Sequence, residues 1–367
     1  MNKLSRGKKP DLILLLVTLA LVTVGTVMIY SSSSILATER YQDGQYFLKK
    51  QIVFLALGLL LMILMTRIPY YLLRKLAWPG IAVSVLLLGA IWIPNVGVRA
   101  GGAVRWLSLG VFSFQVSEVV KIALILFLAH FLTQRADYIK EIRKGILIPL
   151  LVTVLLAGMI VIQPDFGAMA ILVIIALLMI CMAGGRIVHL AGLAALSLPV
   201  AIWMLVHKSY RLARVMTFLD PWQDPSHSGF QIVQSLIAFG SGGPFGVGIG
   251  DGLQKLFYLP EPHTDFILSV IAEEGGFVAV ALVLLFYIVL IIRGFQISVK
   301  APELFGNLLA AGLTAMLALG AFINIAGVMG LIPLKGLALP FLSYGGTSLV
   351  MSLVAVGILL NISAYER

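Results

Sequence analysis

The chain has 367 residues, of which 60% are hydrophobic and only 11% carry a charge. Soluble domains carry about 25% charged residues, so this composition excludes an ordinary soluble enzyme. The formal net charge is +10. No basic-aromatic module typical of nucleic-acid binding accompanies it, so we expect these charges to lie in cytoplasmic loops and to meet anionic lipid headgroups, with no nucleic-acid partner.

Apolar blocks of about 18 to 25 residues follow one another along the chain, and this is the length that crosses a bilayer as a helix. They predict an all-α polytopic membrane protein with about ten transmembrane helices, in one domain over residues 1–367. The expected spans are 11–31, 51–67, 76–94, 117–134, 145–162, 166–184, 187–207, 265–292, 304–329 and 341–362.

The distribution of basic residues predicts the orientation of these spans. With the N-terminus inside, the short loops on that side carry more lysine and arginine than the short loops on the other side, as cytoplasmic loops do. Both termini are therefore predicted to be cytoplasmic. The largest outer segment is 208–264, and its stretch 230–239 is apolar but too short to cross, which predicts an interfacial or re-entrant helix.

Asp265 lies where the chain enters the eighth span. A carboxylate there costs free energy unless it faces a polar cavity, which makes it a candidate site residue. The alternative is that Thr264 or Asp265 caps the helix. Glu273 and Glu274 follow inside the same span and require protonation or buried partners. Because Glu274 points nearly opposite to Asp265, we expect it to be structural and packed against another helix.

Further polar residues gather near the outer ends of other spans. Glu118 and Lys121 are three residues apart on one helix face, which predicts either a helix-end ion pair or the polar wall of an outward cavity. Asp165 fits a helix N-cap as well as a site residue. The remaining candidates are Arg211, Arg214, Lys335 and Ser343. A cavity with both signs of charge suits an anionic substrate that also offers a hydroxyl, such as a lipid-linked pyrophosphoryl sugar.

Several other enzyme classes are excluded by local sequence. The glycine-rich run 240–252 has neither the spacing of a dinucleotide loop nor a following Lys-Ser/Thr, so it is either a flexible connector or a loop whose amides approach an anion. The histidines form no metal motif, and no serine lies in a Gly-x-Ser-x-Gly elbow. The one cysteine, Cys181, allows no intramolecular disulfide.

Several motifs resemble, in order, those of the SEDS family (shape, elongation, division and sporulation), which are bacterial peptidoglycan glycosyltransferases. They are Tyr46-Phe-Leu-Lys-Lys-Gln51, Arg105-Trp106, Phe114-Gln-Val-Ser-Glu118, Gln163-Pro-Asp-Phe-Gly167, Pro262-His-Thr-Asp265 and Pro340-Phe-Leu-Ser-Tyr-Gly-Gly346. The chain resembles the cell-division branch, the FtsW type, more than the rod-elongation branch, the RodA type, and the sporulation branch stays open. This distinction rests on Asp220-Pro-Trp-Gln-Asp-Pro225, Ser228-Gly-Phe-Gln-Ile-Val-Gln-Ser235 and Pro333-Leu-Lys-Gly-Leu-Ala-Leu-Pro340.

The resemblance implies a SEDS fold in a bacterial cytoplasmic (inner) membrane, at the division septum. It implies that lipid II is polymerised on the outer face and that undecaprenyl pyrophosphate is released. On this hypothesis Asp265 is the general base. The residues expected to bind substrate are Glu118, Lys121, Asp165, Arg211, Arg214, Lys335 and Ser343.

The implied partners are lipid II, a class B penicillin-binding protein transpeptidase, other division-complex membrane proteins and membrane lipids. No cofactor is expected with certainty, and a divalent cation, Mg²⁺ or Mn²⁺, stays open although no dedicated metal site is visible. Besides polymerisation by a cell-division enzyme, three alternatives stay open: an elongation-type polymerase, a flippase and a scaffold. A lipid II flippase needs polar residues along a whole path, and a scaffold that only recruits partners does not need Asp265.

Overall fold

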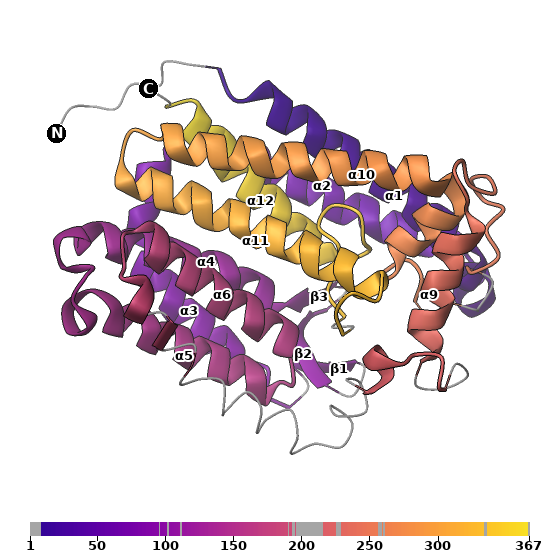
Figure 1. Cartoon of the computed structure of the whole chain (residues 1–367), viewed down its shortest axis with the longest axis horizontal. Coiled ribbons are helices and arrows are strands. Elements are labelled where there is room, and N and C mark those ends of the chain that lie inside the picture. Colours follow the sequence, from indigo (N-terminus) through magenta and orange to yellow (C-terminus); the bar gives the residue numbers. More distant parts are fainter. Residues whose placement is uncertain are drawn as a thin grey trace.

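Every expected span except the seventh corresponds to a helix in the computed structural model (Figure 1). The structure describes residues 9–94, 96–100, 103–110, 112–189, 191–192, 195, 216–224, 229–255, 259, 261–333 and 336–365. The seventh expected span, 187–207, lies largely outside these residues. Among them, eight helices are long and apolar enough to cross a membrane, which makes the chain a multi-pass membrane protein.

The elements follow one another in this order. The longer helices are α1 (Leu12–Tyr41), α2 (Tyr46–Arg67), α3 (Ala77–Ala90), α4 (Val116–Gln134), α5 (Leu147–Ile162), α6 (Phe166–Met182), α9 (Phe230–Ser241), α10 (Ile267–Lys300), α11 (Leu304–Val328) and α12 (Gly346–Ser363). The short elements are the 3₁₀ helices Tyr70–Leu76 and Ala136–Tyr138, the π-helical turn Ile142–Ile146, and the strands β1 (Gly97–Ala100), β2 (Ala103–Leu109) and β3 (Phe112–Gln115).

Hydropathy located the spans better than it located their ends. Helix α1 continues past residue 31 to Tyr41, and α10 continues past residue 292 to Lys300. Apolar composition marks only the part of a helix that lies in hydrocarbon, and the helix continues where polar residues follow. In contrast, α12 begins at Gly346, after the expected start at 341, because residues 339–343 form a turn in which the Ser343 amide donates to the Leu339 carbonyl.

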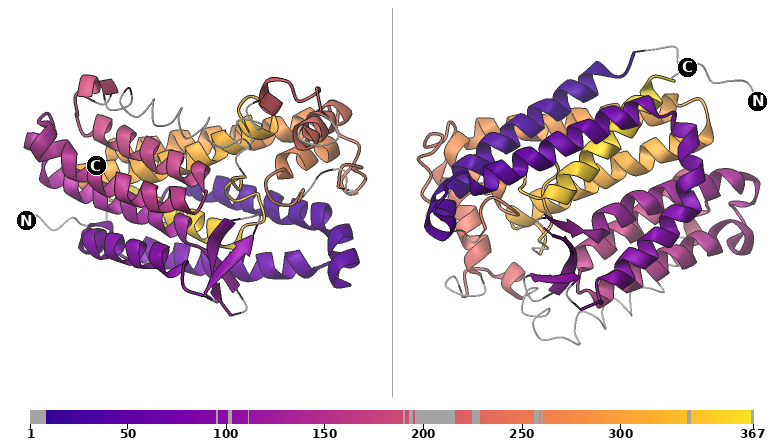
Figure 2. Two further views of the ribbon diagram at one scale, coloured as in Figure 1. Left: turned by 90° about the horizontal axis from the view of Figure 1, so that it is seen from below. Right: turned by 180° about the vertical axis from the view of Figure 1, so that it is seen from behind.

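The helices lie side by side, and the two termini lie at the same end of the bundle (Figure 1). The opposite end carries α9 and the strands β1–β3, and we call it the distal end (Figure 2). Helices α4, α11 and α12 are the most buried; α3 packs against α4, α10 against α11 and α2 against α12. Buried apolar side chains fill this centre, and the outer helices expose apolar side chains, as expected for contact with lipid.

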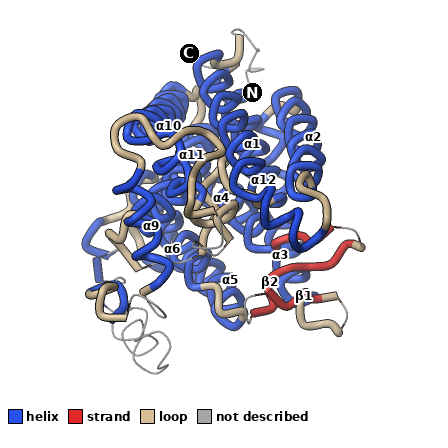
Figure 3. The backbone as a smooth tube through the Cα atoms, turned by 90° about the vertical axis from the view of Figure 1, so that its right-hand side faces the viewer, coloured by secondary structure: helices blue, strands red, loops and turns tan. Residues whose placement is uncertain are grey.

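A small antiparallel sheet at the distal end was not expected from the sequence, in which residues 95–116 only connect the expected spans 76–94 and 117–134. Strands β1, β2 and β3 pair in chain order, with Val98 opposite Trp106 and Leu107 opposite Phe114. Figure 3 looks onto this end and shows the strands beside the bundle. Strands of four to seven residues give a weak periodic signal, so pairing between neighbours decides them. Apart from this sheet, the described fold is all-α as expected.

Helix α10 is interrupted at Gly276, where the backbone has φ 67° and ψ −167°. The glycine-rich run 240–252 packs into this break. The amide of Phe277 donates to the carbonyl of Gly243 (2.8 Å), and the amide of Val247 donates to the carbonyl of Glu273 (3.0 Å). Irregular backbone at membrane depth requires protein partners of this kind. The short helix α9, which leads into the run, confirms the expected non-spanning helix over 230–239.

Candidate active site

Asp265 lies in the turn that precedes α10 at the distal end and is partly buried. It lines a small cavity, about 10 Å³, together with Asn324 of α11 and with Gly336 and Leu337 of the loop that follows α11. The capping alternative is wrong, because Phe266 precedes α10 and no side chain caps this helix. The carboxylate of Asp265 is thus turned toward a cavity, as its position in the sequence predicted.

Burial raises the pKa of Asp265 from 3.8 to about 6, because the charged form loses water. The value of about 6 includes two smaller effects: the negative charge of Glu261 in the same turn raises the pKa, and the positive charge of Arg105 in β2 lowers it. A carboxyl group with a pKa near 6 is mostly ionised at neutral pH and is a stronger base than an exposed aspartate. These properties suit the abstraction of a proton from a hydroxyl.

Glu118 and Lys121 form an ion pair at the first turn of α4, with 2.8 Å between Oε1 and Nζ. Both side chains are more than nine-tenths buried, so this lysine does not extend to the membrane surface. The pair lines a second small cavity, about 20 Å³, with Ser348 and Ser352 of α12. The expected ion pair is confirmed, although its lysine is buried and does not snorkel. The pair also lines a cavity, and its expected contact with substrate stays a prediction.

Leu337 separates the two cavities and lines each of them. The loop that carries it packs closely on its neighbours. A Cβ on Gly167 at the start of α6 would lie 3.1 Å from the Leu337 side chain, and a Cβ on Gly336 would lie 3.3 Å from an oxygen of Asp265. The segment that follows α11 thus contributes one leucine to both cavities, that of Asp265 and that of the Glu118–Lys121 pair.

Asp165 is buried, and its carboxylate caps α6 by accepting from the amide of Ala168 (3.0 Å). The neighbouring loop is held by Arg105, whose guanidinium donates to the carbonyls of Gln163 (3.3 Å) and Pro164 (2.6 Å). The N-cap interpretation of Asp165 is confirmed. Its expected contact with substrate stays a prediction.

Ser343 is buried in the turn before α12, where its hydroxyl accepts from the amide of Leu339 (2.8 Å). This hydrogen bond gives the residue a structural contact, and its expected contact with substrate stays a prediction. Three of the predicted substrate-binding cations, Arg211, Arg214 and Lys335, lie outside the described residues.

Glu273 and Glu274 are both buried and both have protein partners, as the sequence required. Glu274 accepts from the Ser31 hydroxyl of α1 (2.7 Å) and from the ammonium of Lys255 (2.8 Å), which confirms its expected packing against another helix. Glu273 accepts from the amide of Leu253 (2.9 Å). The amides at the end of the glycine-rich run therefore bind the protein's own carboxylates.

Sequence reasoning missed two residues of this region. Asn324 is an amide inside an apolar helix, and a polar group in such a place is the signal that was available. Lys255 lies in the long outer loop, where nothing distinguished it from a surface lysine. Among the described residues, no group of three or more His, Cys, Asp or Glu side chains is placed to hold a metal ion.

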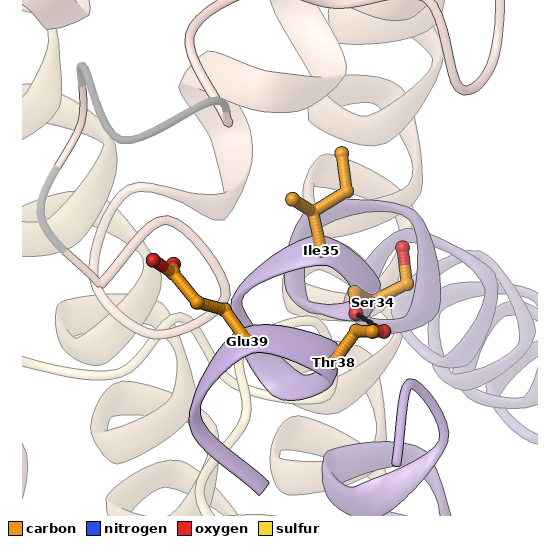
Figure 4. A pocket seen from close by; sticks show the side chains of 4 residues that line it. All are labelled: Ser34, Ile35, Thr38 and Glu39. Atoms are coloured by element: carbon orange, nitrogen blue, oxygen red, sulfur yellow. Dashed lines mark hydrogen bonds between the residues drawn. The ribbon is translucent and has the colours of Figure 1, made fainter. Parts of the chain in front are cut away.

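A wider hollow, about 400 Å³, lies over α1 (Figure 4). It is lined by Ser34, Ile35, Thr38 and Glu39, and the Thr38 hydroxyl donates to the Ser34 carbonyl (2.8 Å). These residues belong to one helix and bring no second charged group toward Glu39. Among the described cavities, the pair on either side of Leu337 therefore remains the candidate site.

Comparison with known proteins identifies the family. The family described as "Cell cycle protein", which comprises FtsW, RodA and SpoVE, matches residues 11–367. The chain belongs to this family. It is thus a SEDS protein, and the resemblance seen in its motifs is confirmed.

Two relatives cover nearly the whole chain. The "Probable peptidoglycan glycosyltransferase FtsW" of Trichlorobacter lovleyi is 46% identical over 354 residues, which are 96% of this chain and 93% of that protein. The "Stage V sporulation protein E" of Bacillus subtilis is 42% identical over 364 residues, which are 99% of each. Relatives called FtsW predominate among the most similar proteins, so the chain is of the FtsW type.

Two solved structures share the fold. One, described as "Structural coordination of polymerization and crosslinking by a peptidoglycan synthase complex", has a TM-score of 0.79 and 33% identity, and covers 96% of this chain and 97% of that one. The rod shape determining protein RodA of Thermus thermophilus has a TM-score of 0.70 and 29% identity, and the match covers 96% of each chain. The SEDS fold expected from the motifs is therefore confirmed.

Proposed function

We propose that this protein is a peptidoglycan glycosyltransferase that polymerises lipid II into glycan strands during cell division. The observation that carries the proposal is a partly buried aspartate with a raised pKa, in a cavity at the distal end of an FtsW-type chain. With both termini in the cytoplasm, as the basic residues predict, the distal end lies on the outer face of the bacterial inner membrane. Its expected place in the cell is the division septum.

Asp265 acts as the general base in an inverting displacement. It takes the proton from the 4-hydroxyl of the acceptor's GlcNAc as that oxygen attacks the anomeric carbon of the donor. The new glycosidic bond forms as the bond from the anomeric carbon to the pyrophosphate oxygen breaks, and undecaprenyl pyrophosphate leaves with the electron pair. The proton on Asp265 then passes to solvent, which restores the base.

The leaving pyrophosphate gains negative charge in the transition state, so cations near it lower the barrier. Lys121, Arg211, Arg214 and Lys335 are the proposed cations. Lys121 is held in place by its ion pair with Glu118, which orients the ammonium. Glu118, Asp165 and Ser343 are proposed to orient the substrate.

The two cavities of about 10 and 20 Å³ hold roughly one water molecule each. Lipid II is far larger, so substrate entry requires that the segment carrying Leu337 move and that the two cavities join. Asp265 and Lys121 would then face one space. We propose that the base and a cation then flank the reacting bond.

A divalent cation, Mg²⁺ or Mn²⁺, is a further proposal. The carboxylate of Asp165 caps a helix, and that of Glu118 is paired with a lysine. The described residues thus do not offer the set of oxygen ligands that a resident Mg²⁺ uses. Such an ion would bind chiefly through the substrate's pyrophosphate and would neutralise its charge.

The proposed partner is a class B penicillin-binding protein transpeptidase, with other division-complex proteins and membrane lipids around it. A structural relative comes from a complex described as coordinating polymerisation and crosslinking, which supports this partner. The flippase alternative is not favoured, because the internal carboxylates Glu273 and Glu274 are bound to protein groups.

Asp265→Asn tests the function. Purified wild type with its transpeptidase should form glycan from lipid II, and the folded variant should form almost none, because an amide does not accept the proton. Asp43→Asn is the matched control, since Asp43 is an exposed carboxylate near the distal end that pairs with Lys49 (2.7 Å). Equal polymer from wild type and Asp265→Asn would remove Asp265 from the mechanism, and no polymer from the wild type would favour the flippase.

A further inference from the structure

Asn324 ties the turn of Asp265 to the loop that follows α11. Its side chain is only 6% exposed, and its Nδ2 donates to the carbonyl of Asp265 (2.8 Å) and to the carbonyl of Leu337 (2.7 Å). A carbonyl oxygen only accepts hydrogen bonds, so both contacts must come from the NH₂ group of Asn324. They therefore distinguish the Nδ2 end of the amide from its Oδ1 end. The Oδ1 atom is left without a hydrogen-bond partner among the described residues.

A second buried asparagine shows what a purely structural amide looks like in this chain. Asn361 of α12 donates through Nδ2 to the carbonyl of Thr66 (2.8 Å) and accepts through Oδ1 from the amide of Tyr70 (2.9 Å). Both ends of its amide are therefore used. Asn324 differs because its acceptor has no partner among the described residues, and a buried unpaired acceptor is unfavourable until a donor reaches it.

Asn324, whose Oδ1 is unpaired among the described residues, and Asp265 line the same cavity. A group that enters this space lies beside two residues that can accept hydrogen bonds, through the carboxylate of Asp265 and the amide oxygen of Asn324. Such a pair selects a molecule that carries neighbouring donors and rejects one that lacks them. The sugar of lipid II has such donors in its hydroxyl groups and its acetamido N–H.

We propose that Asn324 positions Asp265 through its two backbone contacts and accepts, through Oδ1, a hydrogen bond from a hydroxyl or acetamido N–H of the acceptor sugar. This inference rests on the proposed function. The contacts to Asp265 and Leu337 hold the base against the loop that closes the cavity. The contact through Oδ1 orients the sugar so that its reacting hydroxyl faces the base.

The charged groups around Asp265 influence its pKa, and the pH profile of the polymerisation rate should reflect that pKa. Glu261 in the same turn and Arg105 of β2 act on it, and Lys335 in the facing loop lies outside the described residues. Asn324→Asp adds a carboxylate to this set and removes both amide donors. A like charge raises the pKa of its neighbour, so the acid limb of the rate profile should move to higher pH.

The experiment uses the full-length protein with its transpeptidase and measures kcat and KM for lipid II between pH 5 and 8, with thermal unfolding of each variant. Asn324→Leu should lower kcat/KM by about 10- to 100-fold with a raised KM, as expected for a hydrogen bond lost in a closed site. Asn361→Leu is the matched control; it should lower the Tm comparably and leave kcat/KM within about twofold of wild type. Asn324→Ser, which keeps one donor, replaces Asn324→Leu if the latter does not fold.

A folded Asn324→Leu with wild-type kcat, KM and pH profile overturns the inference, as does an equal loss of kcat/KM in Asn361→Leu. Equilibrium binding of lipid II separates this failure from that of the proposed function. If the wild type binds lipid II but makes no polymer where a known relative does, the function fails. In that case the inference stands only if Asn324→Leu weakens lipid II binding by about tenfold or more. A wild type that does not bind lipid II overturns both the proposed function and this inference.

Discussion

The raised pKa of Asp265 makes the pH dependence of polymerisation a direct test of its role as the base. Because Asp265 must be ionised to accept a proton, kcat/KM should follow its ionised fraction. With a pKa of about 6, this fraction falls from about 0.9 at pH 7 to about 0.1 at pH 5, a roughly tenfold loss of rate. With the ordinary value of 3.8, the fraction at pH 5 would still be about 0.9.

The perturbation that tests the cause of this pKa is Glu261→Gln. It removes the negative charge that raises the pKa of Asp265, so the acid limb should move to lower pH. The side chain of Glu261 is 54% exposed, and water screens its charge, so we expect a displacement of less than about one pH unit. Glu141→Gln is the matched control, because Glu141 is 53% exposed, pairs with Lys144 and lies in the connection between α4 and α5, far along the chain from Asp265.

The assay is the initial rate of glycan formation from lipid II between pH 4.5 and 8, with thermal unfolding measured at each pH so that loss of fold is separated from loss of ionisation. The midpoint of the acid limb should lie near pH 6 for the wild type and at lower pH for Glu261→Gln. For Glu141→Gln it should equal that of the wild type. A wild-type limb below pH 5, or a Glu261→Gln limb displaced to higher pH, would refute the argument that burial and the neighbouring charge set this pKa.

Two further predictions concern the interrupted helix α10. Gly276→Ala should lower the Tm measured in detergent by several degrees or abolish folding, because φ is 67° and a Cβ would lie 2.3 Å from the Gly246 amide nitrogen. Gly158→Ala, where the space is open, should leave the Tm nearly unchanged. Lys255→Met and Glu274→Gln should each lower the free energy of unfolding by about 3–5 kcal/mol, since each leaves one member of a buried ion pair without its partner. The double variant should recover part of that loss in a double-mutant cycle, and fully additive losses would show that the pair is not coupled.

The sequence by itself determined the class of the protein and most of its membrane helices. An apolar block long enough to span the bilayer forms a transmembrane helix largely independently of the rest of the chain, so hydropathy alone predicts these helices. The same reasoning singled out Asp265, Glu273 and Glu274, because a carboxylate within or beside a span is costly unless it has a polar partner or faces a polar cavity. The motifs then indicated the SEDS family, which the comparisons confirmed.

Only the tertiary structure decided what each polar group does. Glu274 and Asp265 follow the same sequence rule, yet one binds Lys255 and Ser31 while the other lines a cavity. The glycine-rich run covers the break in α10 because residues 20 to 34 positions later in the chain supply carboxylates and backbone groups that bind it. The role of Asn324 depends on two carbonyls, 59 and 13 positions away in the chain. Contacts of this kind arise from how helices pack, and helical periodicity in one segment carries no information about them.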